Sequence, residues 1–227
     1  MLPAPSSAAA KTRARVLVVD DHPVLRRGVA QIINGERDLV VCGEADSAAA
    51  TLGAITKFQP DILLLDLRLG AGGGLSLVRD VKAAHPKLPI LVLSMHDEFL
   101  YAERVLRAGA MGFVMKQESA DHIVQAIRVV LGGRTYLSEK MTQEMLQRVR
   151  VTPQRATSTS ELAMLSDREL EVFDCIGQGL PTREIAARLF VSVKTVETHI
   201  DHIKAKLGIQ SGHALIRRAM MWSIDRE

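Results

Sequence analysis

Val16-Leu17-Val18-Val19-Asp20-Asp21 gives the first indication of the architecture, because an apolar run of strand length ends in two carboxylates. A run with no polar face is typical of a strand that is covered on both sides, as in a parallel sheet flanked by helices. In open parallel sheets, ligands bind beyond the carboxyl ends of the strands. The stretch therefore predicts a covered parallel sheet with a functional site at the edge where Asp20 and Asp21 lie.

Four further apolar runs of strand length follow this stretch. They occupy residues 40–42, 62–65, 90–93 and 113–115. Segments of helical length alternate with them at residues 24–33, 48–58, 75–84 and 98–108, and a fifth at residues 120–131 begins after Ser119, a favourable N-cap. Strands and helices in regular alternation predict an α/β domain with a five-stranded, parallel, doubly wound sheet of the flavodoxin-like type.

The chain changes character after this first domain. A helical stretch at residues 137–149 precedes residues 152–160, whose Thr, Ser, Pro and Gln content predicts a flexible linker. Ser166 and Glu169 have the spacing of a capping box, which opens the first of four short helices with no strand pattern between them. We therefore expect a first domain over residues 13–134, a linker with a helical segment over 135–160, and a small all-α domain over 161–227.

Composition argues against some classes of protein and leaves the class of partner open. No apolar run approaches the roughly 18 residues that a membrane span needs, and the N-terminal stretch lacks the features of a secretory signal. We therefore expect a cytoplasmic protein without a membrane partner, in which Cys42 and Cys175 are buried thiols rather than a disulfide. The net charge of +3 decides nothing, but residues 183–218 hold seven basic and three acidic side chains, which favours a phosphate-facing surface there.

Five polar groups are expected to meet at the carboxyl edge of the sheet. Asp20 and Asp21 follow the first strand, and the ends of the third, fourth and fifth strands supply Asp66, Ser94 and Lys116. Three carboxylates at one edge repel one another unless a cation joins them, and a hard divalent ion such as Mg²⁺ prefers their oxygens. Lys116 adds a fixed positive charge, and Ser94 adds a hydroxyl donor. Together these groups would hold a phosphoryl group attached to Asp66.

These motifs resemble the receiver domain of response regulators over about residues 14–133. The matching segments are Val-Val-Asp20-Asp21-His22, Leu-Leu-Asp66-Leu, Leu-Ser94-Met and Phe113-Val-Met-Lys116. The resemblance implies that Asp66 accepts phosphate from a sensor histidine kinase. It also implies that Asp21, Asp66 and the backbone carbonyl of Arg68 bind Mg²⁺, with Asp20 assisting.

The same resemblance implies a switch, in which the Ser94 hydroxyl moves to the phosphate and the Phe113 ring turns inward. One departure concerns the loop after Asp66, which reads Leu69-Gly70-Ala71-Gly72-Gly73-Gly74 where the family usually has Met-Pro-Gly. Loss of proline and added glycine predict a more mobile loop and a less firmly held metal. An aspartyl-phosphate phosphatase would need a second Asp two positions after the nucleophile, where this chain has Arg68, so we do not expect an enzyme.

The C-terminal segments resemble the LuxR-type helix-turn-helix. They are Leu165-Ser-Asp-Arg-Glu-Leu-Glu-Val, Gly179-Leu-Pro-Thr-Arg-Glu-Ile-Ala-Ala-Arg-Leu and Val191-Ser-Val-Lys-Thr-Val-Glu-Thr-His-Ile, followed by Lys206-Leu-Gly-Ile. Together with the receiver motifs, they are similar to the NarL/FixJ class of response regulators. This resemblance implies a homodimer that binds double-stranded promoter DNA and regulates transcription.

The third helix of the C-terminal domain contains the expected DNA contacts. An apolar stripe is expected to pack inward and consists of Val193, Val196, Ile200, Ile203 and Leu207. The resemblance assigns base reading to Glu197, Thr198 and Asp201. It assigns positions near phosphates to Lys194, Thr195, His199 and Lys204. Carboxylates accept from cytosine N4 but repel phosphates, so we expect specific recognition that rests on few contacts and weakens with salt.

Two alternatives stay open at this point. An acidic reading face also fits a phosphorylation-dependent protein-interaction module, whose helical domain binds protein rather than DNA. Constitutive DNA binding with a degenerate receiver is disfavoured, because the acceptor residues are complete. Salt dependence separates phosphorylation-controlled DNA binding from the protein-interaction module, since DNA affinity falls by about 0.9 log units per phosphate contact for each log unit of salt. RNA polymerase is a further partner to consider for a regulator bound at a promoter.

Overall fold

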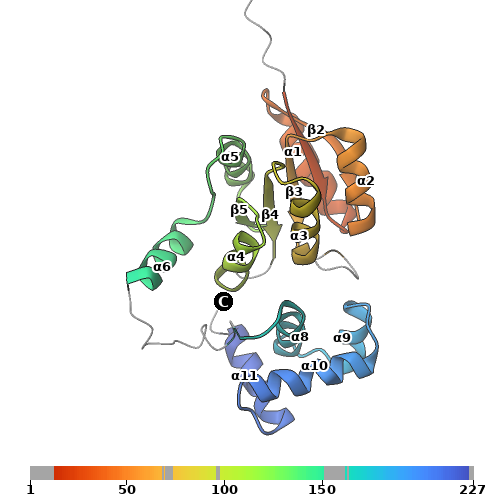
Figure 1. Ribbon diagram of the computed structural model, residues 1–227, viewed down its shortest axis with the longest axis vertical. Helices are drawn as coiled ribbons and strands as arrows, with labels where there is room; N and C mark the ends of the chain where they lie inside the picture. The colour runs from red at the N-terminus through yellow and green to blue at the C-terminus, as the bar shows by residue number, and fades with distance from the viewer. Residues whose placement is uncertain are drawn as a thin grey trace, which may run out of the picture.

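The structure is a computed structural model that describes residues 13–67, 69, 74–95, 98–150, 162 and 164–224. The predictions for Arg68, for residues 70–73 and for the linker after residue 150 lie outside the described residues. Figure 1 shows an N-terminal unit of strands and helices and a C-terminal unit of helices. Within the described ranges, no helix is both long and apolar enough to span a membrane.

A five-stranded sheet forms the centre of the N-terminal unit. Its strands are β1 (Ala14–Val19), β2 (Leu39–Ala45), β3 (Ile62–Asp66), β4 (Ile90–Ser94) and β5 (Gly112–Met115). They lie in the order β2-β1-β3-β4-β5, and every neighbouring pair runs parallel. The predicted doubly wound parallel sheet is therefore confirmed. The strand order reverses between β1 and β3, which is where ligands bind in such sheets.

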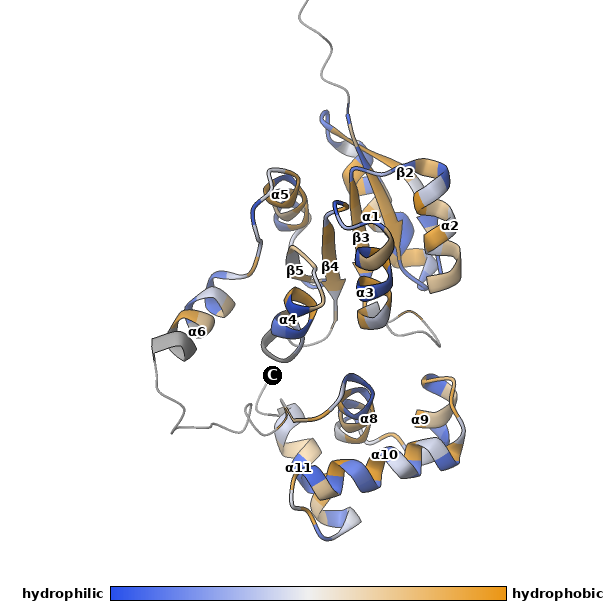
Figure 2. Cartoon of the chain, in the orientation of Figure 1, coloured by the Kyte–Doolittle hydropathy of each residue, from blue (hydrophilic) through white to orange (hydrophobic). Residues whose placement is uncertain are grey.

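Helices cover both faces of the sheet. Successive strand residues point to opposite sides, and because these residues are apolar, both sides must be covered. These helices are α1 (Pro23–Gly35), α2 (Ala48–Phe58), α3 (Gly74–Ala84), α4 (Glu98–Arg107) and α5 (Ala120–Leu131). Leu17 and Leu65 belong to the cluster that packs on α2, α3 and α4, whereas Val16 and Leu64 belong to the cluster that packs on α1 and α5. Figure 2 shows the consequence, with hydrophobic strands in the middle and helices of mixed polarity around them.

The described C-terminal residues form helices and turns, as predicted. Beyond α6 (Glu139–Arg150), the helices are α8 (Asp167–Gly177), α9 (Thr182–Arg188), α10 (Val193–Lys206) and α11 (Gly212–Ile224). The predicted capping box is present at the start of α8. Ser166 Oγ accepts from the Glu169 amide at 3.4 Å, and Glu169 Oε2 accepts from the Ser166 amide at 2.7 Å.

The apolar stripe of α10 packs inward except at its first member. Val196 and Ile203 are completely buried, but Val193 is 39% exposed, so the prediction that it packs inward is wrong. Val193 is the first residue of α10, and Val191, just before the helix, packs against the core instead. Periodicity places a residue on a helix face, but it does not say where the neighbouring helices end.

Gly74 sets how closely α3 approaches the end of β3. Its amide donates to the Leu67 carbonyl oxygen at 2.8 Å. A Cβ at this position would lie 2.4 Å from Leu67 Cα and 2.6 Å from the Asp66 carbonyl oxygen. These are backbone atoms, so a side chain at residue 74 would displace the segment that holds Asp66.

We predict that Gly74→Ala lowers the free energy of unfolding of the N-terminal unit by about 1–3 kcal/mol, the usual range for overpacking. Calorimetry of the N-terminal transition measures this loss. Gly28→Ala in α1 is the matched control, because a Cβ there meets nothing within 4 Å. It should be neutral or stabilise by up to about 1 kcal/mol, since alanine is the better helix former. Equal melting of the two variants would contradict the close approach.

Candidate functional site

Three of the predicted site residues meet through one ammonium group. Asp20 follows β1, Asp66 ends β3 and Lys116 follows β5, so all three lie at the carboxyl edge of the sheet. Lys116 Nζ lies 2.6 Å from Asp20 Oδ2 and 2.7 Å from Asp66 Oδ2. Each of these side chains is at most 5% exposed. Because water does not solvate these buried charges, the ammonium group is needed to offset the repulsion between the two carboxylates.

Asp21 and His22 complete the acidic side of this site. His22 Nδ1 lies 2.7 Å from Asp21 Oδ1, and the His22 amide donates to Asp20 Oδ1 at 2.8 Å. Ligand atoms of Asp20, Asp21, His22 and Asp66 all lie within 4.8 Å of one another. Three carboxylates in this space match the oxygen preference of Mg²⁺, so the donor set fits the predicted ion.

The two predicted switch residues lie on the neighbouring strands. Ser94 ends β4, Phe113 lies on β5, and both are completely buried. The Lys116 amide donates to the Ser94 carbonyl oxygen at 2.8 Å, which joins the ends of these two strands. Phe113 belongs to the same buried apolar cluster as Tyr101 of α4. The structure thus places Ser94 on the strand next to Asp66 and packs Phe113 with residues of α4, and their role as a switch stays a prediction.

Two arginines of the N-terminal unit hold the first turn of α8. Arg79 Nη2 on α3 lies 2.6 Å from Asp167 Oδ2, and Arg104 Nη1 on α4 lies 2.8 Å from Asp167 Oδ1. Arg104 Nη2 also donates to the carbonyl oxygens of Leu162 and Leu165, at 3.0 and 2.8 Å. Arg104 is only 15% exposed, so these bonds satisfy a largely desolvated guanidinium. Figure 1 shows α8 facing α3 and α4 in this arrangement.

A cavity of about 220 Å³ lies between the carboxylate site and the C-terminal unit. Asp21, His22 and Tyr101 line it from the N-terminal unit. Charged residues line its other side, namely Asp167, Arg168, Glu171, Asp174 and Arg188. The cavity therefore lies between Asp21 and His22 of the candidate site and residues of α8 and α9. Sequence reasoning missed this junction, because arginines on an amphipathic helix look like ordinary solvated residues.

The predicted DNA contacts lie along one helix. On α10, the exposed residues are Lys194, Glu197, Thr198 and Asp201, and the half-buried ones are Thr195, His199 and Lys204. Thr195 Oγ1 lies 2.7 Å from Ser192 Oγ, so this residue takes part in the N-cap of the helix. His199 faces α8 and Glu169. The assignment of these residues to bases and phosphates stays a prediction.

Each acid of the predicted reading face has a lysine one turn away. Asp201 Oδ1 lies 2.7 Å from Lys204 Nζ, and Glu197 Oε2 lies 4.0 Å from Lys194 Nζ. The hydrogen bond from Lys204 lowers the pKa of Asp201, so this carboxylate is charged at neutral pH. The face therefore presents charges of both signs, with a lysine beside each acid. This pattern reduces the repulsion of phosphates that two isolated acids would cause.

Two family models match the chain, one in each unit. Residues 16–128 match the response regulator receiver domain, and residues 163–219 match the bacterial regulatory proteins of the luxR family. The oxygen regulatory protein NreC of Staphylococcus carnosus (strain TM300) is 37% identical over 209 residues, which cover 91% of this chain and 96% of NreC. NreC of Staphylococcus aureus (strain JH9) is 35% identical with the same coverage.

Solved structures of similar proteins agree with this result. A two-component response regulator of the LuxR family from Aurantimonas sp. SI85-9A1 is 31% identical with a TM-score of 0.58, covering 62% of this chain and 100% of that chain. RcsB from Salmonella enterica serovar Typhimurium, solved bound to promoter P1flhDC, is 25% identical with a TM-score of 0.65, covering 92% of this chain and 98% of that chain.

A receiver domain joined to a LuxR-type domain defines a two-component response regulator. Within this class, the chain belongs to the LuxR-type, or NarL/FixJ, family of DNA-binding transcription regulators, which are not enzymes. The predicted family, fold class and function are therefore confirmed.

We predict that Lys116→Gln destabilises the receiver domain by about 3–5 kcal/mol, because it leaves Asp20 and Asp66 buried without their cation. Mg²⁺ should then raise the melting temperature of this variant more than that of the wild type, since a second cation can replace the missing charge. Calorimetry with and without Mg²⁺ measures both effects. Lys87→Gln, which changes an exposed lysine, is the control. A variant as stable as the wild type without Mg²⁺ would refute the role of the ammonium.

Proposed function

We propose that Asp66 is the phosphoryl acceptor and that the phosphohistidine of a sensor histidine kinase is its donor. The observation that supports this best is the contact of Lys116 with both Asp20 and Asp66 at the carboxyl edge of the sheet. In the transfer, an Asp66 oxygen bonds to phosphorus while the bond from phosphorus to the imidazole nitrogen breaks. Lys116 and the Ser94 hydroxyl then hold phosphoryl oxygens and neutralise their charge.

We propose that the acidic side of the site holds Mg²⁺. The residues that would bind it are Asp20, Asp21, Asp66 and the backbone carbonyl of Arg68. When bound, Mg²⁺ would neutralise charge on the phosphoryl oxygens during the transfer. The donor set supports this proposal, because ligand atoms from all three carboxylates lie within 4.8 Å of one another.

We propose that phosphorylation releases the LuxR-type domain from the receiver domain. Ser94 and Phe113 would respond to the phosphoryl group, and Phe113 shares a buried cluster with Tyr101 of α4. Arg104 lies three residues after Tyr101 on the same helix, and it donates to both Asp167 and the chain before α8. A small shift of α4 would therefore break several hydrogen bonds to the C-terminal domain together.

The released domains are proposed to bind promoter DNA as a homodimer. RcsB, which is similar in both domains, has been solved as dimers bound to DNA. A two-fold symmetric dimer would read two half-sites through two copies of α10. We propose domain boundaries at residues 13–134 and 161–227, a cytoplasmic location, and RNA polymerase as the further partner at the promoter.

We predict that a small-molecule phosphodonor with Mg²⁺ increases the enrichment of one sequence from a random pool of duplex DNA by the wild-type protein. Asp66→Asn should show no such increase, because a carboxamide cannot form the acyl phosphate. Sequencing of the bound fraction measures the enrichment, and the spacing of half-sites reports the dimer.

Asp80→Asn is the matched control for this experiment, because it makes the same change on the exposed surface of α3. It should behave as the wild type. A phosphodonor response in Asp66→Asn would place the acceptor elsewhere. If Asp66 becomes phosphorylated and no duplex is enriched under any condition, the C-terminal domain binds a protein instead, and the interaction-module alternative replaces DNA binding.

We predict that Arg104→Gln raises the DNA affinity of the unphosphorylated protein, on the order of tenfold, toward that of the phosphorylated wild type. The change removes the charged hydrogen bonds to Asp167 and to the Leu162 and Leu165 carbonyl oxygens. Fluorescence anisotropy with the selected duplex measures the affinity, and small-angle scattering should show a larger radius of gyration.

Arg107→Gln is the control for this prediction, since it changes another arginine of α4 by the same amount. Arg107 is 77% exposed and pairs with Glu103 one turn away on the same helix. Its DNA affinity should match the wild type in both states. An Arg104→Gln protein with wild-type affinity and wild-type dimensions would show that the contact with α8 does not restrain the domain.

A further inference from the structure

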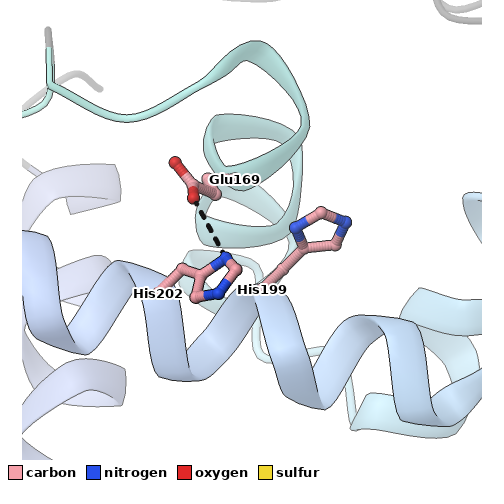
Figure 3. A group of neighbouring side chains, drawn as sticks. All are labelled: Glu169, His199 and His202. Carbon is pink, nitrogen blue, oxygen red and sulfur yellow. Dashed lines mark ion pairs between the residues drawn. The ribbon is translucent and has the colours of Figure 1, made fainter.

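Glu169, His199 and His202 form a cluster between α8 and α10 that has no part in the proposed phosphorylation (Figure 3). Glu169 lies in the first turn of α8, and its side chain is 5% exposed. The two histidines are three residues apart on α10 and therefore share one face of that helix. One ligand atom from each residue lies within 4.8 Å of the other two.

Within the part of the chain that the structure describes, both strong hydrogen bonds to the Glu169 side chain end on one carboxylate oxygen. Oε2 accepts from the Ser166 amide at 2.7 Å and from Lys206 Nζ at 2.6 Å. Oε1 lies 3.6 Å from His202 Nδ1, which is too long for a hydrogen bond. Burial by itself would raise the pKa of Glu169, but the hydrogen bonds from Lys206 and Ser166 outweigh it and hold the pKa below its ordinary value. A charged oxygen therefore faces the two imidazoles.

His199 has a buried ring nitrogen that neither helix capping nor packing explains. Its Nδ1 is buried and has no hydrogen-bond partner among the described residues. Burial, and after it the charge of Arg168, lowers the pKa of His199, so its ring is neutral at neutral pH. A neutral imidazole has one nitrogen lone pair to offer. A buried nitrogen without a partner is destabilising unless something binds it.

We propose that Glu169, His199 and His202 form a binding site for a divalent transition metal, with Zn²⁺ as the best-fitting ion. An ion among three atoms within 4.8 Å of one another lies at most about 2.8 Å from each, whereas zinc bonds to nitrogen and oxygen are about 2.0–2.2 Å. The His202 side chain is 60% exposed, so its ring can rotate to close this gap. Solvent would supply the fourth ligand, and two imidazoles with one carboxylate are a known donor set for zinc.

This cluster differs in chemistry from the carboxylate site of the receiver domain. Three carboxylates suit Mg²⁺, whereas two imidazoles favour Zn²⁺ and its transition-metal neighbours. Lys206 Nζ lies 2.6 Å from the second oxygen of Glu169 and repels any cation, so only an ion with strong bonds to nitrogen is expected there. A bound metal would join α10 to α8 whether or not Asp66 is phosphorylated.

The test is a titration of the full-length protein with Co²⁺ in saturating Mg²⁺, followed by displacement with Zn²⁺. Four-coordinate Co²⁺ with nitrogen ligands absorbs visible light much more strongly than octahedral Co²⁺ bound to oxygens, so the signal distinguishes the two sites. We expect strong absorption for the wild type and its loss when Zn²⁺ is added. His202→Asn and His199→Asn should each weaken Zn²⁺ binding by at least about tenfold.

A matched control and a second readout keep the test independent of folding. His122→Asn removes an exposed imidazole that pairs with Glu118 on α5, and it should bind metal as the wild type does. Zn²⁺ should raise the melting temperature of the LuxR-type domain in the wild type and in His122→Asn but not in the two cluster variants. Fluorescence of Trp222, whose ring lies 5.6 Å from that of Phe173, shows whether each variant is folded.

Three outcomes would overturn the proposal. The first is a wild-type protein that gives no strong Co²⁺ absorption. The second is a folded His202→Asn protein that binds Zn²⁺ as tightly as the wild type. The third is loss of the signal in His22→Asn, which would place the metal in the receiver domain.

Discussion

Buried acidic side chains at the carboxyl edge of the sheet depend on one ammonium group. Asp20 and Asp66 are each 3% exposed, and carboxylates so far from water are strongly destabilising unless a cation pairs with them. Lys116 Nζ contacts both, and it reaches them because β1, β3 and β5 are parallel and end at the same edge. The electrostatics of the site therefore follow from the topology of the sheet, and the proposed metal ion and phosphoryl group would bind beside carboxylates whose charge Lys116 already offsets.

The same topology explains why most of this site could be predicted from the sequence. Each of Asp20, Asp66, Ser94 and Lys116 ends or follows an apolar run, and parallel strands bring such positions together without any knowledge of side-chain packing. Arg104 and its contact with Asp167 could not be predicted in this way. The two residues lie in different domains, and their pairing depends on how α8 packs against α4, which no local pattern encodes. The exposure of Val193 could not be predicted either, because it depends on where the helices packed against α10 end.

The lysines on α10 reduce the repulsion of DNA that its acidic residues would otherwise cause. Sequence alone suggests that Glu197 and Asp201 repel DNA, and the structure places Lys194 and Lys204 one turn from them. Paired charges on a reading face contribute little to non-specific attraction, which depends on net positive charge. If α10 binds DNA as predicted, much of the attraction to phosphates would come from basic residues elsewhere in the domain, and the paired acids would accept hydrogen bonds from bases.

The first turn of α8 contacts both the receiver domain and α10, because residues close together in it have partners on opposite sides. Asp167 forms ion pairs with Arg79 and Arg104 of the receiver domain. Glu169 forms an ion pair with Lys206 and faces the histidines of α10. The capping box between Ser166 and Glu169 makes this turn rigid, and Arg104 also holds the carbonyl oxygen of Leu165 just before it. If phosphorylation breaks the Arg104 contacts as proposed, α8 would be released, and α10 would move with it because Lys206 of α10 pairs with Glu169. The proposed release therefore needs no contact between the receiver domain and α10 itself.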